Sequence, residues 1–380
     1  MNSFKFLNFI KKGDKSYFDV TASEQKQFLD TLELPKDDFD RSYKQYLCQR
    51  FFSTKTKGFI FNIGSIILLP ILLIYYHLKG LKKCRECHID AVGEFSGMTE
   101  IIPESLKSEF EINNEVWFEG AELRMLDIKF ILKFVCRYFY APYFLVKAIA
   151  KIARYSYTIS HRTPRAIIVH DEYSYTSSLL TNYCDFRHVE HIDVMHGEKL
   201  FYIGNSHFRY NRTYIWGEHY KQLFYDLRAN QEQFVIEIPK CFQINCTEAF
   251  RQEYFADYKY YLQVFNEEQL LSIISSMDFA NKKGLVIKYR PHPRFSDITL
   301  LEKHVPSEFI EYPKEVPIVN SIASAKYSVG SYSTVLNQAY YSGKDVIFDD
   351  VTYHEEYNKL KELRYIFSSM DDKRLSTISK

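Results

Sequence analysis

Residues 325–350 read AKYSVGSYSTVLNQAYYSGKDVIFDD, with a polar segment between the first apolar run and the stretch that ends at Gly343. AKYSVG and KDVIFDD predict strands, and STVLNQAYYSG between them predicts a helix. A strand, a helix and a second strand form the unit from which parallel sheets are built. Ligands of such sheets bind outside the carboxyl ends of the strands, so the polar segment GSYST is a candidate binding loop.

The same alternation occurs on both sides of a link near residue 236. The predicted strands are RAIIVH, HIDVMHG and RTYIWG before the link, and KYYLQVF and GLVIKY after it. A chain of 380 residues is too long for one ordinary core. We therefore expect an α/β fold with two facing Rossmann-like domains and parallel sheets, over residues 86–235 and 236–380, behind an N-terminal helical segment at residues 1–85.

The composition excludes several classes of protein. The net charge of +1 gives no reason to expect nucleic acid as a partner. Seven cysteines, an odd number without framework spacing, favour a reduced cytosolic compartment. Cys84 and Cys87 form a CxxC pair, but no second pair lies at a zinc-binding spacing, so no metal site is predicted. The N-terminus lacks the continuous apolar region of a signal peptide.

Residues 59–76 read FIFNIGSIILLPILLIYY and raise the question of a membrane. The run is barely long enough to span a bilayer, Asn62 and Pro70 interrupt it, and lysines on both sides give no orientation. Three interpretations remain open: an in-plane or re-entrant anchor, a buried core helix, and a spanning helix. The first is preferred, because spanning would place the preceding residues on the opposite side of the bilayer from the two predicted α/β domains.

Residues 128–157 have the composition of a basic amphipathic helix pair, broken at Pro142. Lysines and arginines, such as Lys133, Arg137 and Lys151, are interleaved with aromatic and aliphatic residues, and acidic residues are absent. Such a pair suits an anionic lipid surface, the alternative being a packed helix whose lysines extend to water. We expect a protein that is peripheral to, or shallowly anchored in, an anionic membrane surface.

Two loops of the second half are candidates for binding a phosphate. In YRPHPR, alternate residues point the same way, so that three donors would share one side: Arg290, His292 and Arg294. In GSYST, hydroxyl residues open a helix whose N-terminus attracts anions: Ser331, Ser333 and Thr334. The alternatives are a proline-stiffened surface loop and ordinary helix capping.

Two loops of the first half hold candidate bases. In HDEYS, Asp171 and Glu172 lie at the carboxyl end of a predicted strand, where a carboxylate can serve as a general base that takes a proton from a substrate hydroxyl. The alternative is that one of these acids caps the following helix. In MHGEK, His196 is a base, a phosphate donor or a buried core histidine, three roles that the sequence leaves open.

The order of these motifs is similar to that of a known group of enzymes. HG with Lys199, then YRxHP, then a serine-rich loop and a strand ending in Asp resemble bacterial GT-B glycosyltransferases with cytidine-nucleotide donors. These are the sialyltransferases and polysialyltransferases, and the CDP-glycerol glycerophosphotransferases of teichoic-acid synthesis have a similar series. The resemblance covers residues 165–350 and implies that Asp171 or Glu172 is the base, while His292 and the hydroxyls hold the CMP phosphate.

The resemblance leads to a hypothesis of function. We expect an inverting, metal-independent glycosyltransferase without a cofactor. It would move a sugar, a CMP-activated acidic sugar such as sialic acid, onto a bacterial surface glycan of capsule, O-antigen or lipooligosaccharide. The first domain would hold the glycan or glycolipid acceptor and the second the nucleotide-sugar donor. The alternatives are a CDP-glycerol-type glycerophosphotransferase, another nucleotide-sugar transferase, and a non-catalytic membrane-associated scaffold. The expected location is the cytoplasmic face of the bacterial inner membrane.

Overall fold

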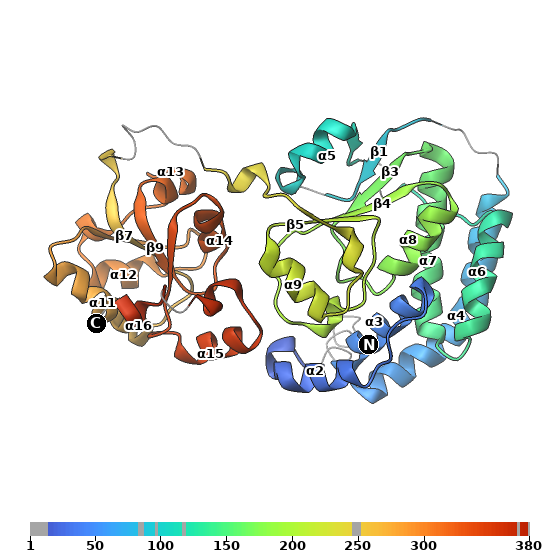
Figure 1. Cartoon of the computed structure of the whole chain (residues 1–380), viewed down its shortest axis with the longest axis horizontal. Helices are drawn as coiled ribbons and strands as arrows, with labels where there is room; N and C mark the ends of the chain where they lie inside the picture. The colour runs from blue at the N-terminus through green and yellow to red at the C-terminus, as the bar shows by residue number, and fades with distance from the viewer. Residues whose placement is uncertain are drawn as a thin grey trace. The chain divides into compact units, whose positions relative to one another are not determined.

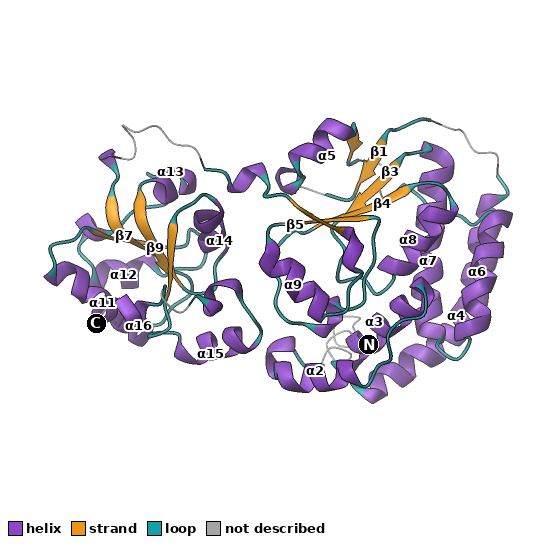
Figure 2. Ribbon diagram, in the orientation of Figure 1, coloured by secondary structure: helices purple, strands orange, loops and turns teal. Residues whose placement is uncertain are grey.

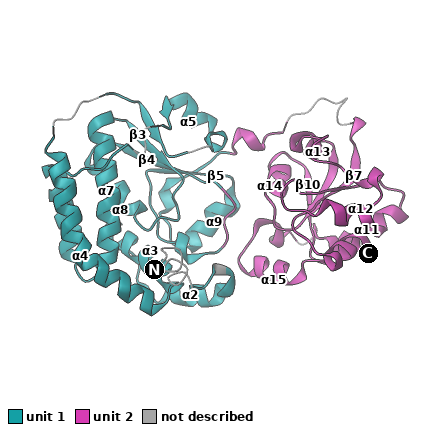
Figure 3. Ribbon diagram, turned by 180° about the vertical axis from the view of Figure 1, so that it is seen from behind, with its two compact units in different colours: residues 1–196, 201–237 teal, residues 197–200, 238–380 magenta. Residues whose placement is uncertain are grey.

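The computed structural model of the chain describes residues 14–82, 87–95, 98–115, 119–244, 252–370 and 373–378. The chain divides into two compact units (Figure 3). Unit 1 comprises residues 1–196 and 201–237, and unit 2 comprises residues 197–200 and 238–380. The helices that precede the first strand belong to unit 1, and the boundary near the predicted link lies after Glu237.

Unit 1 is built on a six-stranded sheet. The strands follow the order β2-β1-β3-β4-β5-β6, and each neighbouring pair is parallel. They are β1 (Ala91–Gly93), β2 (Ile112–Asn113), β3 (Ala166–Val169), β4 (Glu190–Val194), β5 (Arg212–Ile215) and β6 (Phe234–Ile236). The chain passes from β1 outward to β2 and then returns to the other side of β1 for β3. The topological switch point of this sheet therefore lies between β1 and β3.

Helices cover both faces of this sheet (Figures 1 and 2). The helices of unit 1 are α2 (Ala22–Asp30), α3 (Asp38–Phe51), α4 (Lys55–Gly80), α5 (Glu104–Glu109), α6 (Met125–Tyr138), α7 (Pro142–Arg162), α8 (Ser177–Phe186) and α9 (Glu218–Asp226). On one face, Leu106 and Phe110 form a buried cluster with Ile168 of β3. On the other face, Tyr155 of α7 hydrogen-bonds His191 of β4 at 2.8 Å. Alternate strand residues thus serve the two faces.

The basic stretch 128–157 forms two helices that break at Pro142, as predicted, but α7 is a core helix. Thirteen of its residues are buried. Arg137 forms an ion pair with Asp37, and Lys151 with Asp171. These acidic partners come from distant parts of the sequence, which the local composition does not reveal. The expectation that α7 lies on a lipid surface is therefore wrong.

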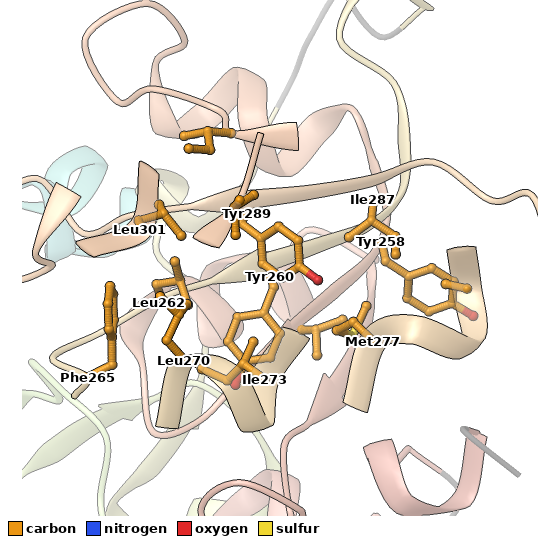
Figure 4. Packing of buried hydrophobic residues seen from close by; sticks show 14 of the residues in the cluster. Tyr258, Tyr260, Leu262, Phe265, Leu270, Ile273, Met277, Ile287, Tyr289 and Leu301 are labelled. Atoms are coloured by element: carbon orange, nitrogen blue, oxygen red, sulfur yellow. The ribbon is translucent and has the colours of Figure 1, made fainter. Parts of the chain in front are cut away.

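Unit 2 contains a four-stranded sheet in the order β10-β9-β7-β8, again with parallel neighbours. The strands are β7 (Ala256–Tyr261), β8 (Ile287–Arg290), β9 (Ala325–Gly330) and β10 (Asp345–Phe348). The helices are α11 (Glu267–Lys282), α12 (Ile298–His304), α13 (Ile318–Ala323), α14 (Thr334–Tyr341), α15 (His354–Glu362) and α16 (Leu375–Ile378). Leu270, Ile273 and Met277 of α11 belong to one buried cluster with Tyr258 and Tyr260 of β7 (Figure 4).

Each unit is thus a Rossmann-like arrangement of a parallel sheet with covering helices. Two such units in one chain form the GT-B type of fold, with α2, α3 and α4 ahead of the first strand. The predicted fold class is confirmed. The expected ligand sites lie at the carboxyl edge of each sheet, because parallel sheets bind ligands there.

Candidate active site

The switch point of the unit 2 sheet lies between β7 and β9, since the chain crosses β7 between β8 and β9. Gln263 lies two residues beyond β7, and Ser333 lies three residues beyond β9. The Gln263 amide Nε2 donates a hydrogen bond to the Ser333 hydroxyl at 2.9 Å. The loops after β7 and β9 therefore meet at the position where ligands of open α/β sheets bind.

The loop after β8 joins the same network. The His292 backbone N–H donates to the Ser296 hydroxyl at 2.8 Å, and that hydroxyl donates to the Gln263 carbonyl at 2.8 Å. A continuous chain of hydrogen bonds thus links His292, Ser296, Gln263 and Ser333. The RPHPR and SYST segments, both predicted to bind a phosphate, lie close together in unit 2.

His292 is held as a neutral hydrogen-bond donor. Its Nδ1 accepts the backbone N–H of Arg294 at 3.1 Å, and its ring stacks on Phe295 with centroids 4.5 Å apart. Partial burial, and then the charge of Arg294, lower the pKa of His292 below its ordinary value. With Nδ1 acting as acceptor, the proton of the neutral ring resides on Nε2, which can donate to a phosphate oxygen. The Arg294 side chain is exposed.

Arg290 has a different position from its two neighbours. Its side chain is only 6% exposed, and its guanidinium donates to Glu311 at 2.8 Å. Glu311 also pairs with the buried Lys259. Burial favours the protonated carboxyl, but the two cations outweigh burial and hold the pKa of Glu311 below its ordinary value. Arg290 therefore anchors the loop from inside, and its predicted contact with a phosphate stays a prediction.

The three hydroxyl residues surround the start of α14. Ser333 is its N-cap and accepts the Val335 N–H at 3.3 Å, while Thr334 is the first helical residue and is exposed. Ser331 is 5% exposed and follows Gly330. A Cβ on Gly330 would lie 3.2 Å from the Tyr261 carbonyl, so a side chain there would push β9 from β7. The positive end of the α14 dipole faces the same loops.

A hollow in unit 2 lies at the amino edge of the sheet, opposite these loops. It is lined by residues at the amino ends of β7 and β9, among them Phe255, Ala325 and Lys326. Because parallel sheets bind their ligands at the carboxyl edge, this hollow is not the expected donor site.

Unit 1 brings two of the three predicted bases together. Glu172 lies three residues beyond β3, and His196 lies two residues beyond β4. The His196 Nδ1 atom is 3.6 Å from the Glu172 carboxylate. The Glu172 side chain is 1% exposed, whereas that of His196 is 34% exposed. A substrate can therefore reach the imidazole, and the carboxylate lies behind it.

His170 completes this cluster. Its ring centroid is 4.7 Å from that of His196, and burial, followed by the neighbouring His196, lowers the pKa of His170. The loop itself is held by α3, because Gln45 donates to the carbonyls of Glu172 and Gly204, each at 3.0 Å. Helix α3 therefore holds the loop after β3 in position.

Asp171, the third predicted base, is engaged elsewhere. Lys151 of α7 forms an ion pair with its carboxylate and donates to Ser174 at 2.8 Å. The Asp171 N–H donates to Asp193 of β4 at 2.9 Å. An ion-paired carboxylate is a weaker candidate for accepting a substrate proton than the exposed imidazole of His196.

Sequence reasoning missed several residues of these networks, among them Gln45, Lys151, His170, Gln263 and Ser296. Gln263 lies inside the predicted strand KYYLQVF, but β7 ends at Tyr261, so Gln263 belongs to the loop after it. Ser296 is an ordinary polar residue after the RPHPR loop, and only the strand order shows that the two residues meet. Cys84 of the CxxC pair lies outside the described residues, and Cys87 is exposed. In the described part of the chain, no three His, Cys, Asp or Glu side chains group as metal ligands.

Comparison with known proteins gives limited similarity. No family model matches the chain, and no curated protein matches it. Among solved structures, the chain is similar to a variant of the wall teichoic acid polymerase TagF with CDPG, at 10% identity and a TM-score of 0.39 over 84% of each chain. It is also similar to UDP-N-acetylglucosamine 2-epimerase from Rickettsia bellii, at 12% identity and a TM-score of 0.38. That match covers 68% of this chain and 79% of the epimerase. Similarities of this size assign neither substrate nor reaction.

Proposed function

We propose that the chain is a GT-B-type transferase that moves a group from a nucleotide-activated donor to a hydroxyl acceptor. The observation that carries the proposal is the hydrogen-bonded chain from His292 through Ser296 and Gln263 to Ser333. It places an imidazole, hydroxyls and a helix N-terminus at one switch point. These groups bind phosphate without a metal ion.

The acceptor side of the reaction belongs to unit 1 in this proposal. His196 takes the proton from the acceptor hydroxyl, and the buried Glu172 orients the ring and stabilises the imidazolium that forms. In unit 2, the His292 Nε2–H, the exposed Arg294 and the first turn of α14 stabilise the charge on the departing nucleotide phosphate. A single displacement of this kind inverts the configuration when the transferred group is a sugar.

The motif resemblance favours a cytidine nucleotide. Two donors fit it: a CMP-activated acidic sugar for a surface glycan, and a CDP-linked unit such as CDP-glycerol. The panel that tests the proposal is a thermal-shift series with CMP, CDP, UDP and GDP, each with and without EDTA. We expect CMP or CDP to raise the melting temperature most, with no effect of EDTA. The better of the two then identifies the kind of donor.

The matched variants are H292A and H304A. His304 lies on α12 and contacts Glu267, outside the loops of the candidate site. H292A should abolish most of the nucleotide-induced shift, and H304A should keep it. Absence of any shift with all four nucleotides would instead support a non-catalytic scaffold. Stabilisation by UDP alone, or a strict need for Mn²⁺, would refute the metal-free cytidine site.

A further inference from the structure

Among the described residues, one helix is long and apolar enough to cross a bilayer. It is α4, Lys55–Gly80, whose most apolar 18-residue window has a mean hydropathy of 2.2 and is only 11% buried. The outer face of α4 exposes a row of large aliphatic side chains, with Ile66, Ile67 and Ile74 each exposed by more than 60%. The interpretation of residues 59–76 as a buried core helix is therefore excluded, and the face needs an occupant.

The inner stripe of α4 packs on unit 1 along its length. The Asn62 side chain accepts the Tyr143 N–H of α7 at 3.3 Å, and Phe61 stacks on Tyr143 with centroids 5.0 Å apart. Near the other end, the Tyr76 carbonyl accepts the Leu123 N–H at 2.9 Å. A helix that is apolar all round and covered on one side only lies at a boundary between protein and another apolar phase.

The segments before and after α4 belong to the same folded unit. In α3, which precedes it, the Ser42 hydroxyl accepts the Leu179 N–H of α8 at 2.8 Å, and Gln45 holds the Glu172 loop. These contacts are buried. Both ends of α4 must therefore lie on one side of any bilayer, and the helix cannot cross it while unit 1 is folded.

The charges around α4 favour an anionic lipid surface over a second copy of the chain as its partner. No Asp or Glu occurs from residue 55 to residue 82, and lysines flank the apolar run at both ends: Lys55, Lys57, Lys79 and Lys82. Two copies packed through this face would bring lysines together, whereas anionic headgroups would neutralise them. Lys79 lies 4.6 Å from the centroid of Tyr75, an aromatic–lysine pair typical of a membrane interface.

We propose that the outer face of α4 inserts in plane into the headgroup region of an anionic bilayer, as a monotopic anchor. Met125 and Leu126, exposed by 63% and 47%, follow Leu123 and extend the apolar surface at the end of α4. Lys129 and Lys133 of α6 are exposed beside them in the chain. The contact is thus centred on α4, and the attachment is independent of the reaction that the protein performs.

The test is co-sedimentation of the full chain with vesicles. One set contains phosphatidylcholine alone, and the other also contains phosphatidylglycerol. The variant I63Q/I67Q/I71Q/I74Q changes four exposed residues on the outer face, and the control L271Q/V286Q/V319Q changes exposed residues of unit 2. We expect binding to the anionic vesicles, a loss of about tenfold or more in the α4 variant, and no loss in the control. An unchanged melting temperature shows that the variant is folded.

Three results would overturn the proposal. The first is unchanged vesicle binding by the folded α4 variant. The second is a dimer of the wild-type chain that becomes monomeric in the variant without any vesicle binding, because a second copy would then cover the face. The third is protection of one flank of α4 from a protease that is added outside sealed vesicles, because the helix would then cross the bilayer. Cleavage of both flanks by the external protease supports the in-plane anchor.

Discussion

The residues that the candidate chemistry needs differ in burial, and burial decides their roles. The loop HDEYS offers two acids, but Lys151 engages Asp171, and Glu172 is buried behind His196. The sequence left three roles open for His196, and its 34% exposed side chain beside a buried carboxylate favours the general base. This division of labour between imidazole and carboxylate can be tested directly.

Replacing His196 by Asn should lower turnover by a factor of about 100 or more, because a general base contributes roughly 10²–10⁴-fold. Nucleotide-induced stabilisation should stay unchanged, since the donor loops belong to unit 2. E172Q should reduce turnover less, because it removes the orienting charge but keeps the ring. The measurement is nucleotide release with the donor that the thermal-shift panel selects. H188N, at an exposed position of unit 1, is the control.

The opposite ranking would change the assignment. If E172Q abolished turnover and H196N kept it near normal, the carboxylate itself would be the base. If both variants kept near-normal turnover, the base would lie elsewhere, and Glu94, directly after β1 at the switch point, would be the next candidate.

Gln263 is the residue that joins the three loops of unit 2. Q263A removes the hydrogen bond to Ser333 while leaving the backbone carbonyl for Ser296. We expect nucleotide affinity to fall about tenfold, since a lost hydrogen bond and a looser loop together cost on the order of 1.5 kcal/mol. Calorimetric titration measures this change. Q338A, further along α14, should leave affinity unchanged, and equal losses in both variants would contradict the linking role.

The sequence predicts where strands occur better than it predicts which elements pack against each other. AKYSVG coincides with β9, and the apolar part of RAIIVH coincides with β3, because short apolar runs between polar turns are a local signal. The same change from apolar to polar residues predicts the loops at the carboxyl ends of these strands. The local composition does not predict the burial of α7, because the acid that neutralises its Lys151 is Asp171, which lies outside the basic stretch. Gln263 was missed because its importance depends on strand order.

A buried charge network connects β7, β8 and the segment after the short helix Ser307–Phe309. Lys259 and Arg290 both pair with Glu311, and all three side chains are nearly inaccessible. E311A would leave two cations buried without that partner, so we expect a loss of about 3–5 kcal/mol in the free energy of unfolding. Urea unfolding measures it, with the exposed E308A as control. A loss below about 1 kcal/mol would show that water or another acid replaces Glu311.

At the scale of the molecule, the two units should respond differently to acid. Burial lowers the pKa of both His191 and His207 in unit 1 to about 3, from an ordinary value of 6.5. In unit 2, the buried acid Glu311 has a lowered pKa, so its contribution to stability is present above its ordinary value of 4.5 and is lost only as pH falls below that value. Lowering the pH should therefore reduce the stability of unit 1 before that of unit 2.

The direction of the pH dependence follows from proton uptake on unfolding. Between pH 6.5 and about 3, the two histidines are neutral in the folded state and protonated in the unfolded state. Stability is complete above pH 6.5 and falls as pH decreases through this window. At pH 5, which is 1.5 pH units below 6.5, each histidine lowers the free energy of unfolding by about 2 kcal/mol, at 1.36 kcal/mol per pH unit.

Scanning calorimetry at pH 7 and pH 5 checks this expectation through the melting temperature of each unit. The transition of unit 1 should move down much more than that of unit 2. H207N removes one titrating ring, and Asn tolerates the left-handed backbone of this position, where φ is +60°. The variant should be less stable at pH 7 but show a smaller decrease between pH 7 and pH 5. An equal decrease in both units, or an unchanged pH dependence in H207N, would show that the buried histidines do not control the acid response, because the unfolded state would then gain no extra protons from them.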